Sequence, residues 1–385
     1  MRFHRTGLQW APAVALVAVA LPLAPLAARG RTSDKTMAAR INAIFSAVTS
    51  PDAPGLAVVV RKNARTVFER GYGMRDLRCK LPVTPRTNFR LASCTKQFTA
   101  MAVMLLVHDG KLRYDEPLTD VFPDFPAYGR KITIRNLLNH TSGLQSYEDL
   151  QEKEYPGVSW EHIPQIHDAG VLRLMEQQTG TKFPPGTNWE YSNTGYCVLA
   201  MVVQKISGMP FAEFLKRRIF QPLGMRGTVA YVYGKNHVSN RAYGYTNDAG
   251  VWLETDQSPT SATLGDGGVY SSVADLVKWD NALRNHTLLS ARAMKPALTP
   301  VSLPLDAQHW PKGPDSEPVK YGFGWFLNPY RGHQRMWHYG SSIGFHTAIE
   351  RFPKDRLTIV VLCNRTDLDP AKLALKVADL YFGPK

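Results

Sequence analysis

Segments with strand character lie at both ends of this 385-residue chain, and helical patterns fill the part between them. Two of these segments, Gly55 to Arg61 and Thr66 to Tyr72, flank a short polar turn near the N-terminus. Four more lie near the C-terminus, at 324–327, 334–339, 346–352 and 357–363, and a helical pattern follows at 371–381. Half-sheets that pair around a helical insertion explain this order. We therefore predict an α/β (α+β) fold whose sheet is formed from N- and C-terminal segments, with a mostly helical inserted subdomain.

The middle of the chain carries several helical patterns and one long irregular segment. Apolar residues recur at helical spacing from Thr194 to Ile206 and again from Pro210 to Phe220. Further helices are predicted at 37–48, 132–144, 168–178 and 272–283, and a proline-rich loop at 307–319. The segment from Gln145 to Pro185 is long for a connection, and such segments are usually functional covers. These patterns place the sheet part at about 37–110 and 318–385, and the helical part at about 111–317.

One helical pattern, which begins near Phe89 and ends at Gly110, carries a possible nucleophile and base. Ser93 and Lys96 lie three residues apart, so on a helix their side chains share one face. Serine is a poor nucleophile without an adjacent base. The apolar residues that follow would bury this helix, and burial pushes a lysine toward the neutral amine that a base must be. The alternative is a helix-capping Ser93 beside a solvated Lys96, because Ser-x-x-Lys also occurs often by chance.

The first 28 residues have the pattern of a secretory signal peptide. Arg2 and Arg5 precede an apolar run from Ala11 to Ala24, and small residues follow up to Ala28. A membrane anchor is the alternative, but the run is short and interrupted by prolines. We expect a secreted or periplasmic protein whose mature chain, residues 29–385, is one hydrolase domain. Cleavage removes two arginines and no acidic residue, so the net charge of +14 becomes +12.

Cysteine and histidine spacing gives no sign of a metal site. The four cysteines, Cys79, Cys94, Cys197 and Cys363, are widely separated, and the eleven histidines form no His-Glu-x-x-His cluster. Burial as small apolar side chains is the simplest expectation for Cys94 and Cys197. An exported chain can form disulfides, but the sequence leaves their pairing open. We expect no metal and no cofactor. We also expect no nucleic-acid partner, because the positive charge accompanies no nucleic-acid motif.

Two further motifs could complete a catalytic site. Tyr191 and Asn193 lie two apart in a turn and can face one cleft, where a phenol and an amide supply hydrogen-bond donors and acceptors. His338, Gly340 and Ser341 lie near the end of a predicted strand. Gly340 would allow a ligand to approach the backbone closely, and the N–H of Ser341 could join that of Ser93 in an oxyanion hole. Each motif alone is weak, since turn and strand residues often fit such patterns.

Together the three motifs resemble a known family. Ser-x-x-Lys, Tyr-x-Asn about a hundred residues later, and a final strand with Lys, His or Trp before x-Gly is the order of the serine β-lactamase and penicillin-binding superfamily. Other tracts resemble its class C β-lactamase-like branch, which also holds D-alanyl-D-alanine carboxypeptidases, D-aminopeptidases and esterases: 132–144, 185–186, 222–225 and 267–275. The resemblance extends from Met37 to the C-terminus and implies a β-lactamase-like fold with an antiparallel sheet flanked by helices.

The resemblance also implies roles for the matching residues. Ser93 would be the acylated nucleophile, and Lys96 and Tyr191 would exchange protons with it and with the leaving group. Which of these two is the base stays open, because a lysine pKa of about 10.4 and a tyrosine pKa of about 10 would each have to be lowered. Asn193 would hold the substrate amide, and His338 would lie with Gly340 and Ser341 on the strand where substrate docks.

The motif on that strand departs from the β-lactamase pattern. Class C β-lactamases usually carry Lys-Thr-Gly where this chain has His338-Tyr339-Gly340. We expect His338 to bind a substrate carboxylate at low pH and to lose this ability near neutrality, where imidazole loses its charge. The alternative is a neutral histidine hydrogen-bonded within the wall. The departure weakens the case for strong β-lactamase activity and leaves peptidase and esterase activity open.

We therefore predict an exported serine hydrolase that acts through a Ser93 acyl-enzyme. Its substrates would be small esters, amides or peptides, such as D-amino-acid peptides or small acyl esters. The alternatives are a class C-like β-lactamase and a penicillin-binding receptor with little turnover. A second serine, Ser342, lies in a Gly-x-Ser-x-Gly match, but the strand predicted after it does not fit the strand–turn–helix of a nucleophile elbow. The oligomeric state is left open.

Overall fold

The structure, a computed structural model, describes residue 1 and residues 26–302 and 320–383. Most of the predicted signal peptide at 1–28 and all of the predicted loop at 307–319 lie outside the described residues. The first helix, α1 (Leu26–Ser46), begins well before the helix predicted at 37–48 and extends across the predicted cleavage site at Ala28.

A five-stranded antiparallel sheet joins the two ends of the chain, as predicted. Its strand order is β10-β11-β12-β1-β2, and β1 pairs with β12 so that Leu56 lies opposite Cys363. The strands are β1 (Leu56–Lys62), β2 (Arg65–Tyr72), β10 (Met336–Ser342), β11 (Phe345–Phe352) and β12 (Leu357–Cys363). The strand predicted at 324–327 is wrong, because Phe326 makes only isolated bridges to Tyr321 and Trp337.

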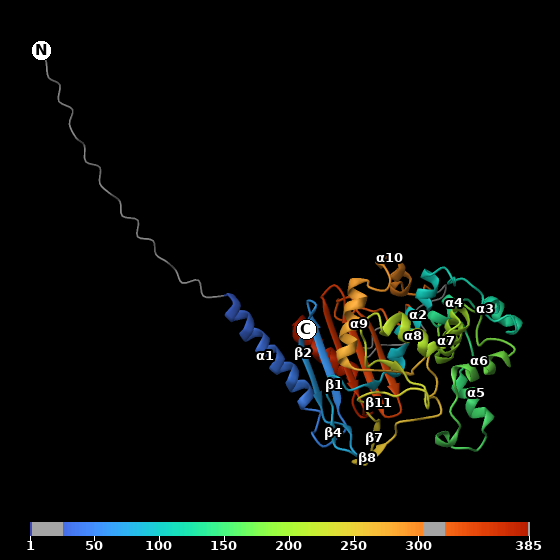
Figure 1. Ribbon diagram of the computed structural model, residues 1–385, viewed down its shortest axis with the longest axis horizontal. Helices are drawn as coiled ribbons and strands as arrows, with labels where there is room; N and C mark the ends of the chain where they lie inside the picture. The colour runs from blue at the N-terminus through green and yellow to red at the C-terminus, as the bar shows by residue number, and fades with distance from the viewer. Residues whose placement is uncertain (2–25, 303–319, 384–385) are drawn as a thin grey trace.

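Both faces of the sheet are covered, because the central strands are apolar on both sides. On β1, Leu56, Val58 and Val60 pack with α1 and with α11 (Pro370–Phe382), whereas Ala57 and Val59 face the larger core. Helix α9 (Val273–Asn285) contacts β1 and β12, and the turn η1 (Ala92–Thr95) contacts β10 and β11. Figure 1 shows the remaining helices gathered on one side of this sheet.

The helical part is built around α7 (Asn193–Ser207), which contacts α2, α4, α6 and α8. Its C-terminal cap is Gly208 in the left-handed conformation, with φ of +69°. The other helices are α2 (Lys96–His108), α3 (Leu118–Val121), α4 (Ile134–Leu138), α5 (Tyr147–Glu154), α6 (Asp168–Glu176), α8 (Phe211–Leu215) and α10 (Ala291–Met294). Two predicted helices are shorter than expected: α4 ends at Leu138, and α8 gives way to a π-helical turn at Lys216–Phe220.

In the part of the chain that the structure describes, three further small sheets form that the sequence patterns did not indicate. They are β3 (Met74–Asp76) with β4 (Leu81–Pro82), β7 (Tyr245–Asp248) with β8 (Val251–Glu254), and the order β5-β9-β6, formed by Phe89–Arg90, Val269–Ser271 and Val229–Ala230. The last sheet fixes the chain just before Ser93, because Arg90 pairs with Tyr270 of β9.

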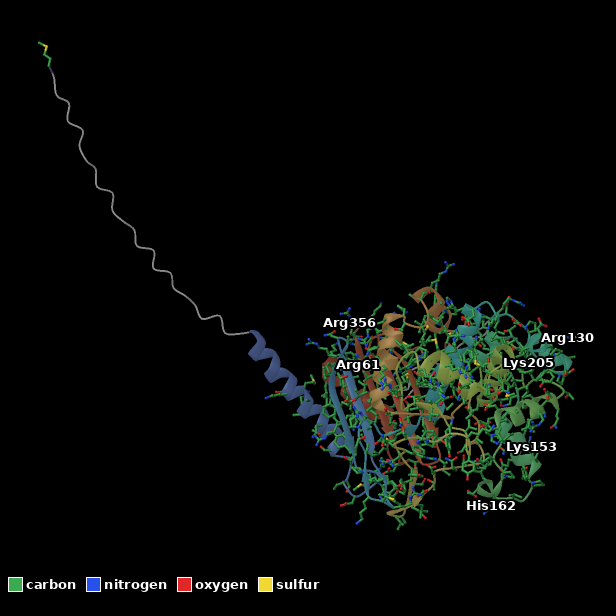
Figure 2. All side chains as sticks on the ribbon, viewed as in Figure 1. Arg61, Arg130, Lys153, His162, Lys205 and Arg356 are labelled. Atoms are coloured by element: carbon green, nitrogen blue, oxygen red, sulfur yellow. The ribbon has the colours of Figure 1, made fainter. Side chains whose placement is uncertain are left out.

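Exposed Arg130, Lys153, Lys205 and Arg356 lie on separate parts of the molecule (Figure 2). Among the described residues, no single helix is long and apolar enough to cross a membrane; α7 and the segment 211–220 pass that test only as a pair bent by 77°. All four cysteines are described and none forms a disulfide, and three of them are buried.

Candidate active site

The turn η1 places Ser93 in the lining of a cleft. We expected an α-helix to start at Ser93, but the structure has a 3₁₀ turn there, and α2 begins at Lys96. Ala92, directly before the serine, has φ of +47°, a conformation that costs energy for a residue with a side chain and is often found at functional sites. Ser93 and Lys96 still face each other, and Lys96 Nζ lies 3.1 Å from Ser93 Oγ.

Lys96 is fully buried and surrounded by oxygen acceptors. Besides Ser93, its Nζ donates to Asn193 Oδ1 at 2.8 Å and to the carbonyl oxygen of Asp266 at 3.0 Å. The ring centre of Tyr191 lies 4.9 Å from the amine. Burial lowers the pKa of Lys96, and the charge of Asp266 opposes this shift only in part. The alternative of a solvated, helix-surface lysine is therefore wrong.

Tyr191 and Asn193 come from the turn that leads into α7, where Ser192 is the N-cap. Burial raises the pKa of Tyr191 well above its usual value, although a hydrogen bond with Ser93 acts in the opposite direction. Asn193 is held at both ends of its amide, because Oδ1 accepts from Lys96 and Nδ2 donates to Glu148 Oε1 at 2.7 Å. The structure thus brings Ser93, Lys96, Tyr191 and Asn193 together.

Two acidic residues belong to this group, and the sequence patterns did not indicate either. Glu148, on α5, fixes the orientation of the Asn193 amide and also accepts from Ser146 Oγ at 3.1 Å. Asp266 precedes β9, and its Oδ2 accepts from the Tyr147 hydroxyl at 3.2 Å. Burial raises the pKa of Glu148. The long segment that contains Glu148 was expected to be functional, but no local motif distinguishes this glutamate from its acidic neighbours.

Strand β10 contributes to the wall of the cleft, and Gly340 on this strand has a role in packing. A side chain there would place Cβ 2.2 Å from the Leu91 carbonyl oxygen and 2.5 Å from Thr347 Oγ1. The glycine therefore allows the nucleophile turn to pack on the strand, and its expected role in the approach of a ligand stays a prediction. Ser341 is exposed and lines the same cleft as Ser93. Ser342 ends β10 in a hairpin with β11, so it is not on a nucleophile elbow.

His338 is buried and does not line the cleft, so the expectation of a cation that faces the cleft is wrong. Its ring is buried, with Nε2 3.1 Å from the Tyr321 hydroxyl and Nδ1 2.7 Å from the Tyr339 carbonyl oxygen. Burial and then the charge of Lys96 lower the pKa of His338 to about 3. The ring is consequently neutral near physiological pH and belongs to an aromatic group with Tyr191, Tyr321 and Phe326.

The cleft has a volume of about 250 Å³ and a mostly polar lining. Ser93 and Asn193 contribute to it, together with Arg90, Tyr147, Glu148, Trp160, Ser258, Thr260, Thr263, Asp266, Ser341 and Ser342. Within the described ranges, no three His, Cys, Asp or Glu side chains are placed to hold a metal ion.

A serine paired with a buried lysine, beside an antiparallel sheet covered by helices, defines a serine hydrolase of the β-lactamase type. The family model described as Beta-lactamase matches residues 40–381, and the chain belongs to that family. The resemblance deduced from the three motifs is thereby confirmed.

Known relatives include penicillin-binding proteins and hydrolases of D-amino acid derivatives. Penicillin-binding protein 4* of Bacillus subtilis (strain 168) is 32% identical over 344 residues, which are 85% of this chain and 72% of that protein. A D-aminopeptidase of Gluconobacter oxydans (strain 621H) is 25% identical, over 86% of this chain and 59% of that protein. D-amino acid amidase from Ochrobactrum anthropi SV3 superposes with a TM-score of 0.74 and 27% identity, over 90% of this chain and 100% of that chain. The protein is an enzyme of this serine hydrolase family.

Proposed function

We propose that the protein is an exported hydrolase that forms an acyl-enzyme at Ser93 on D-amino-acid amides or peptides, and on small acyl esters. The observation that carries this proposal is the 3.1 Å approach of the buried Lys96 amine to Ser93 Oγ. The relatives named D-aminopeptidase and D-amino acid amidase support an amide substrate. The signal-like pattern of residues 1–28 supports export.

The directions of the pKa shifts favour Lys96 as the base. Burial lowers the pKa of Lys96, which increases the fraction of neutral amine, whereas it raises the pKa of Tyr191 and keeps the phenol protonated. A neutral amine can take a proton, and a phenol can give one. The two groups interact through Ser93, so their titration belongs to the pair.

In the proposed reaction, Lys96 takes the proton of Ser93 as Oγ attacks the substrate carbonyl carbon. The N–H groups of Ser93 and Ser341 stabilise the oxyanion of the tetrahedral intermediate. The Tyr191 hydroxyl protonates the leaving nitrogen or oxygen as its bond to the carbonyl carbon breaks, and the Lys96 ammonium then returns a proton to the phenolate. Water attacks the acyl-enzyme in the second half-reaction, which restores Ser93 and releases the acid.

Penicillin-binding protein 4* is among the relatives, and it supports a second candidate, a penicillin-binding protein that acylates with little turnover. A neutral His338 leaves β10 without the fixed cation of Lys-Thr-Gly, so strong β-lactamase activity is the least supported alternative.

Rapid-mixing kinetics separate these functions. The purified mature protein is mixed with a D-amino-acid amide, its L-enantiomer, a neutral 4-nitrophenyl ester and a fluorescent penicillin. The proposal predicts steady turnover of the D-amide and of the ester, with slower turnover of the L-amide. A stoichiometric burst with penicillin and no steady turnover of any substrate would instead establish the receptor.

A further inference from the structure

A second cavity lies between α9 and the end of the large sheet where β11 turns into β12. Its volume is about 260 Å³, and it shares no lining residue with the cleft of Ser93. Its lining includes four arginines and a single carboxylate: Arg61, Arg284, Arg351, Arg356 and Asp280. Figure 2 shows Arg61 and Arg356 on the same side of the molecule. The cavity is therefore strongly basic, and the proposed mechanism does not use it.

The register of the sheet holds two of these arginines on one face. Arg61 on β1 and Arg351 on β11 both lie opposite Thr358 of β12. Residues that lie opposite each other on neighbouring strands point to the same face of the sheet. Here it is the face that α9 covers, because Arg61 Nη1 donates to the Val277 carbonyl oxygen at 2.8 Å. Both arginines are buried, so folding fixes two guanidinium groups beside the helix.

One carboxylate serves three of the arginines. Asp280 Oδ1 accepts from Arg351 Nε at 3.0 Å and from Thr358 Oγ1 at 2.8 Å. Its Oδ2 lies 2.6 Å from Arg284 Nη2 and 3.3 Å from Arg61 Nε. Burial opposes the ionisation of Asp280, but the neighbouring arginines, Arg351 first, lower the pKa of its carboxyl. Asp280 therefore supplies one negative charge, and both of its oxygens are already in use.

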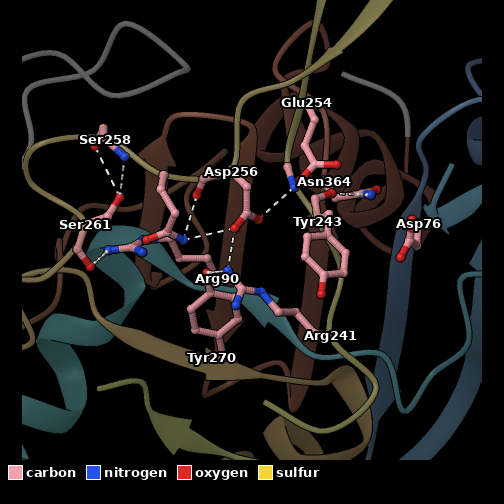
Figure 3. Close-up of polar contacts among 12 residues, drawn as sticks. Asp76, Arg90, Arg241, Tyr243, Glu254, Asp256, Ser258, Ser261, Tyr270 and Asn364 are labelled. Atoms are coloured by element: carbon pink, nitrogen blue, oxygen red, sulfur yellow. Dashed lines mark hydrogen bonds and ion pairs between the residues drawn. The ribbon is translucent and has the colours of Figure 1, made fainter. Parts of the chain in front are cut away.

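The charges in this cavity are not balanced. Elsewhere in the molecule Arg241 forms an ion pair with Asp256, one cation for one carboxylate (Figure 3). In the cavity beside α9, four positive charges against one negative charge leave a net charge of +3. The last carbonyl groups of α9 add only about half a negative charge. Burial lowers the pKa of Arg351, Asp280 opposes this shift, and the charge of Arg284 adds to it. Such an excess of positive charge is costly at a partly buried site and favours the binding of an anion.

Several donors of these arginines lack a strong acceptor. Arg351 Nη1 lies 3.1 Å from the sulfur of Met336, a weak acceptor, and Nη2 lies 3.5 Å from the Asp280 carbonyl oxygen. Among the described residues, Arg284 finds acceptors only for Nη2. The exposed side chain of Arg356 forms no hydrogen bond or ion pair with any described residue. These guanidinium groups can therefore donate together to one bound oxyanion.

We propose that this cavity binds a phosphate group, carried either by inorganic phosphate or by a small phosphate ester. A phosphate group offers more than one negative charge and several oxygens, and guanidinium groups hold it through parallel N–H···O bonds. A single carboxylate has less charge to set against the net +3 of the cavity. Leu283, Leu298 and Phe352 also line the cavity and offer apolar surface to the organic part of an ester. The inference is independent of the proposed function, because the two sites share no lining residue.

Isothermal titration calorimetry of the purified protein tests the site with sodium phosphate, glycerol 1-phosphate and sodium acetate. The ionic strength is held constant with sodium chloride, because salt screens charges. At about pH 8, where a phosphate group carries nearly two charges, we expect saturable binding of phosphate and at least about tenfold weaker binding of acetate. Equal affinity for the two phosphate compounds would identify the free ion as the ligand, and tighter binding of glycerol 1-phosphate would identify an ester. Phosphate should also raise the melting temperature above its value in chloride, because it binds the folded chain.

Arg356→Gln is the most informative variant, because its exposed side chain has no described partner to lose and the fold should be retained. It should raise the Kd for phosphate by about tenfold, the effect of one charge-assisted contact, and the double variant with Arg284→Gln by about a hundredfold or more. Arg130→Gln is the matched control: it removes an exposed arginine on the opposite side of the molecule (Figure 2) and should leave the Kd unchanged.

Two results would overturn the inference: wild-type protein that binds neither phosphate compound saturably at constant ionic strength, or a Kd that is the same in wild type and in both variants of the cavity. The melting temperature in chloride shows that each variant is folded. Labelling of Ser93 by a fluorophosphonate should be unchanged in every variant, so a failure of this site is distinguishable from a failure of the proposed function.

Discussion

The Lys96 amine is buried and has three oxygen acceptors as neighbours, and this geometry leads to a test at the residue scale. Lys96→Ala and Tyr191→Phe should each slow acylation by about a hundredfold or more, the usual effect of losing general acid–base catalysis. The double variant should be little slower than the slower single variant, because the two groups act as a unit. Stopped-flow acylation rates check this. Wild-type rates in both single variants would mean that protons move by another route.

A second residue-scale prediction concerns pH. The pKa of His338 is lowered to about 3, below its unfolded value, so the ring stays neutral from mildly acidic to alkaline pH. The ratio of kcat/KM for a carboxylate substrate to that for a neutral one should therefore show no transition near pH 6.5, in wild type or in His338→Gln. A transition that disappears in His338→Gln would restore the cationic role. Below about pH 6.5 the unfolded chain binds a proton at His338 and the folded chain does not. His338 therefore lowers the free energy of unfolding as the pH falls below about 6.5.

At the scale of elements, the packing of η1 on β10 depends on Gly340. Alanine there would bring Cβ against backbone oxygen at 2.2 Å, so the turn that carries Ser93 would have to move. Gly340→Ala should lower the free energy of unfolding by about 1–3 kcal/mol and slow acylation as well. Gly180→Ala is the matched control, because nothing lies within 4 Å of its added Cβ. Denaturant titration of both variants measures the difference, and equal stabilities would contradict the packing account.

The length and the burial of an element determine how well the sequence predicts it. Strands such as β12 are predictable because a long apolar run, here Leu357–Cys363, is buried on both faces. Strands of two or three residues, such as β5, have no periodicity to detect. Among site residues, the motifs locate Ser93 and Lys96 because their spacing is local. Glu148 meets Asn193 across 45 positions, and no local pattern encodes that contact.

At the scale of the whole molecule, we expect that residues 1–28 can be removed without loss of the core. Among the described side chains of α1, Ile41 and Phe45 are buried and pack on the sheet well after the predicted cleavage site. We predict that the protein recovered from outside the cytoplasm starts near Arg29 and melts at the same temperature as the full chain. N-terminal sequencing and calorimetry test this. Recovery of the intact chain in the membrane fraction would favour an anchor.

Ser93 is proposed as the nucleophile for every substrate of the enzyme. The most direct measurement is the intact mass and peptide map of the protein after reaction with a fluorophosphonate. We predict one adduct, on the peptide that contains Ser93, absent from Ser93→Ala and retained in Ser342→Ala. Full labelling of Ser93→Ala, or an adduct that maps to Ser342, would contradict the account.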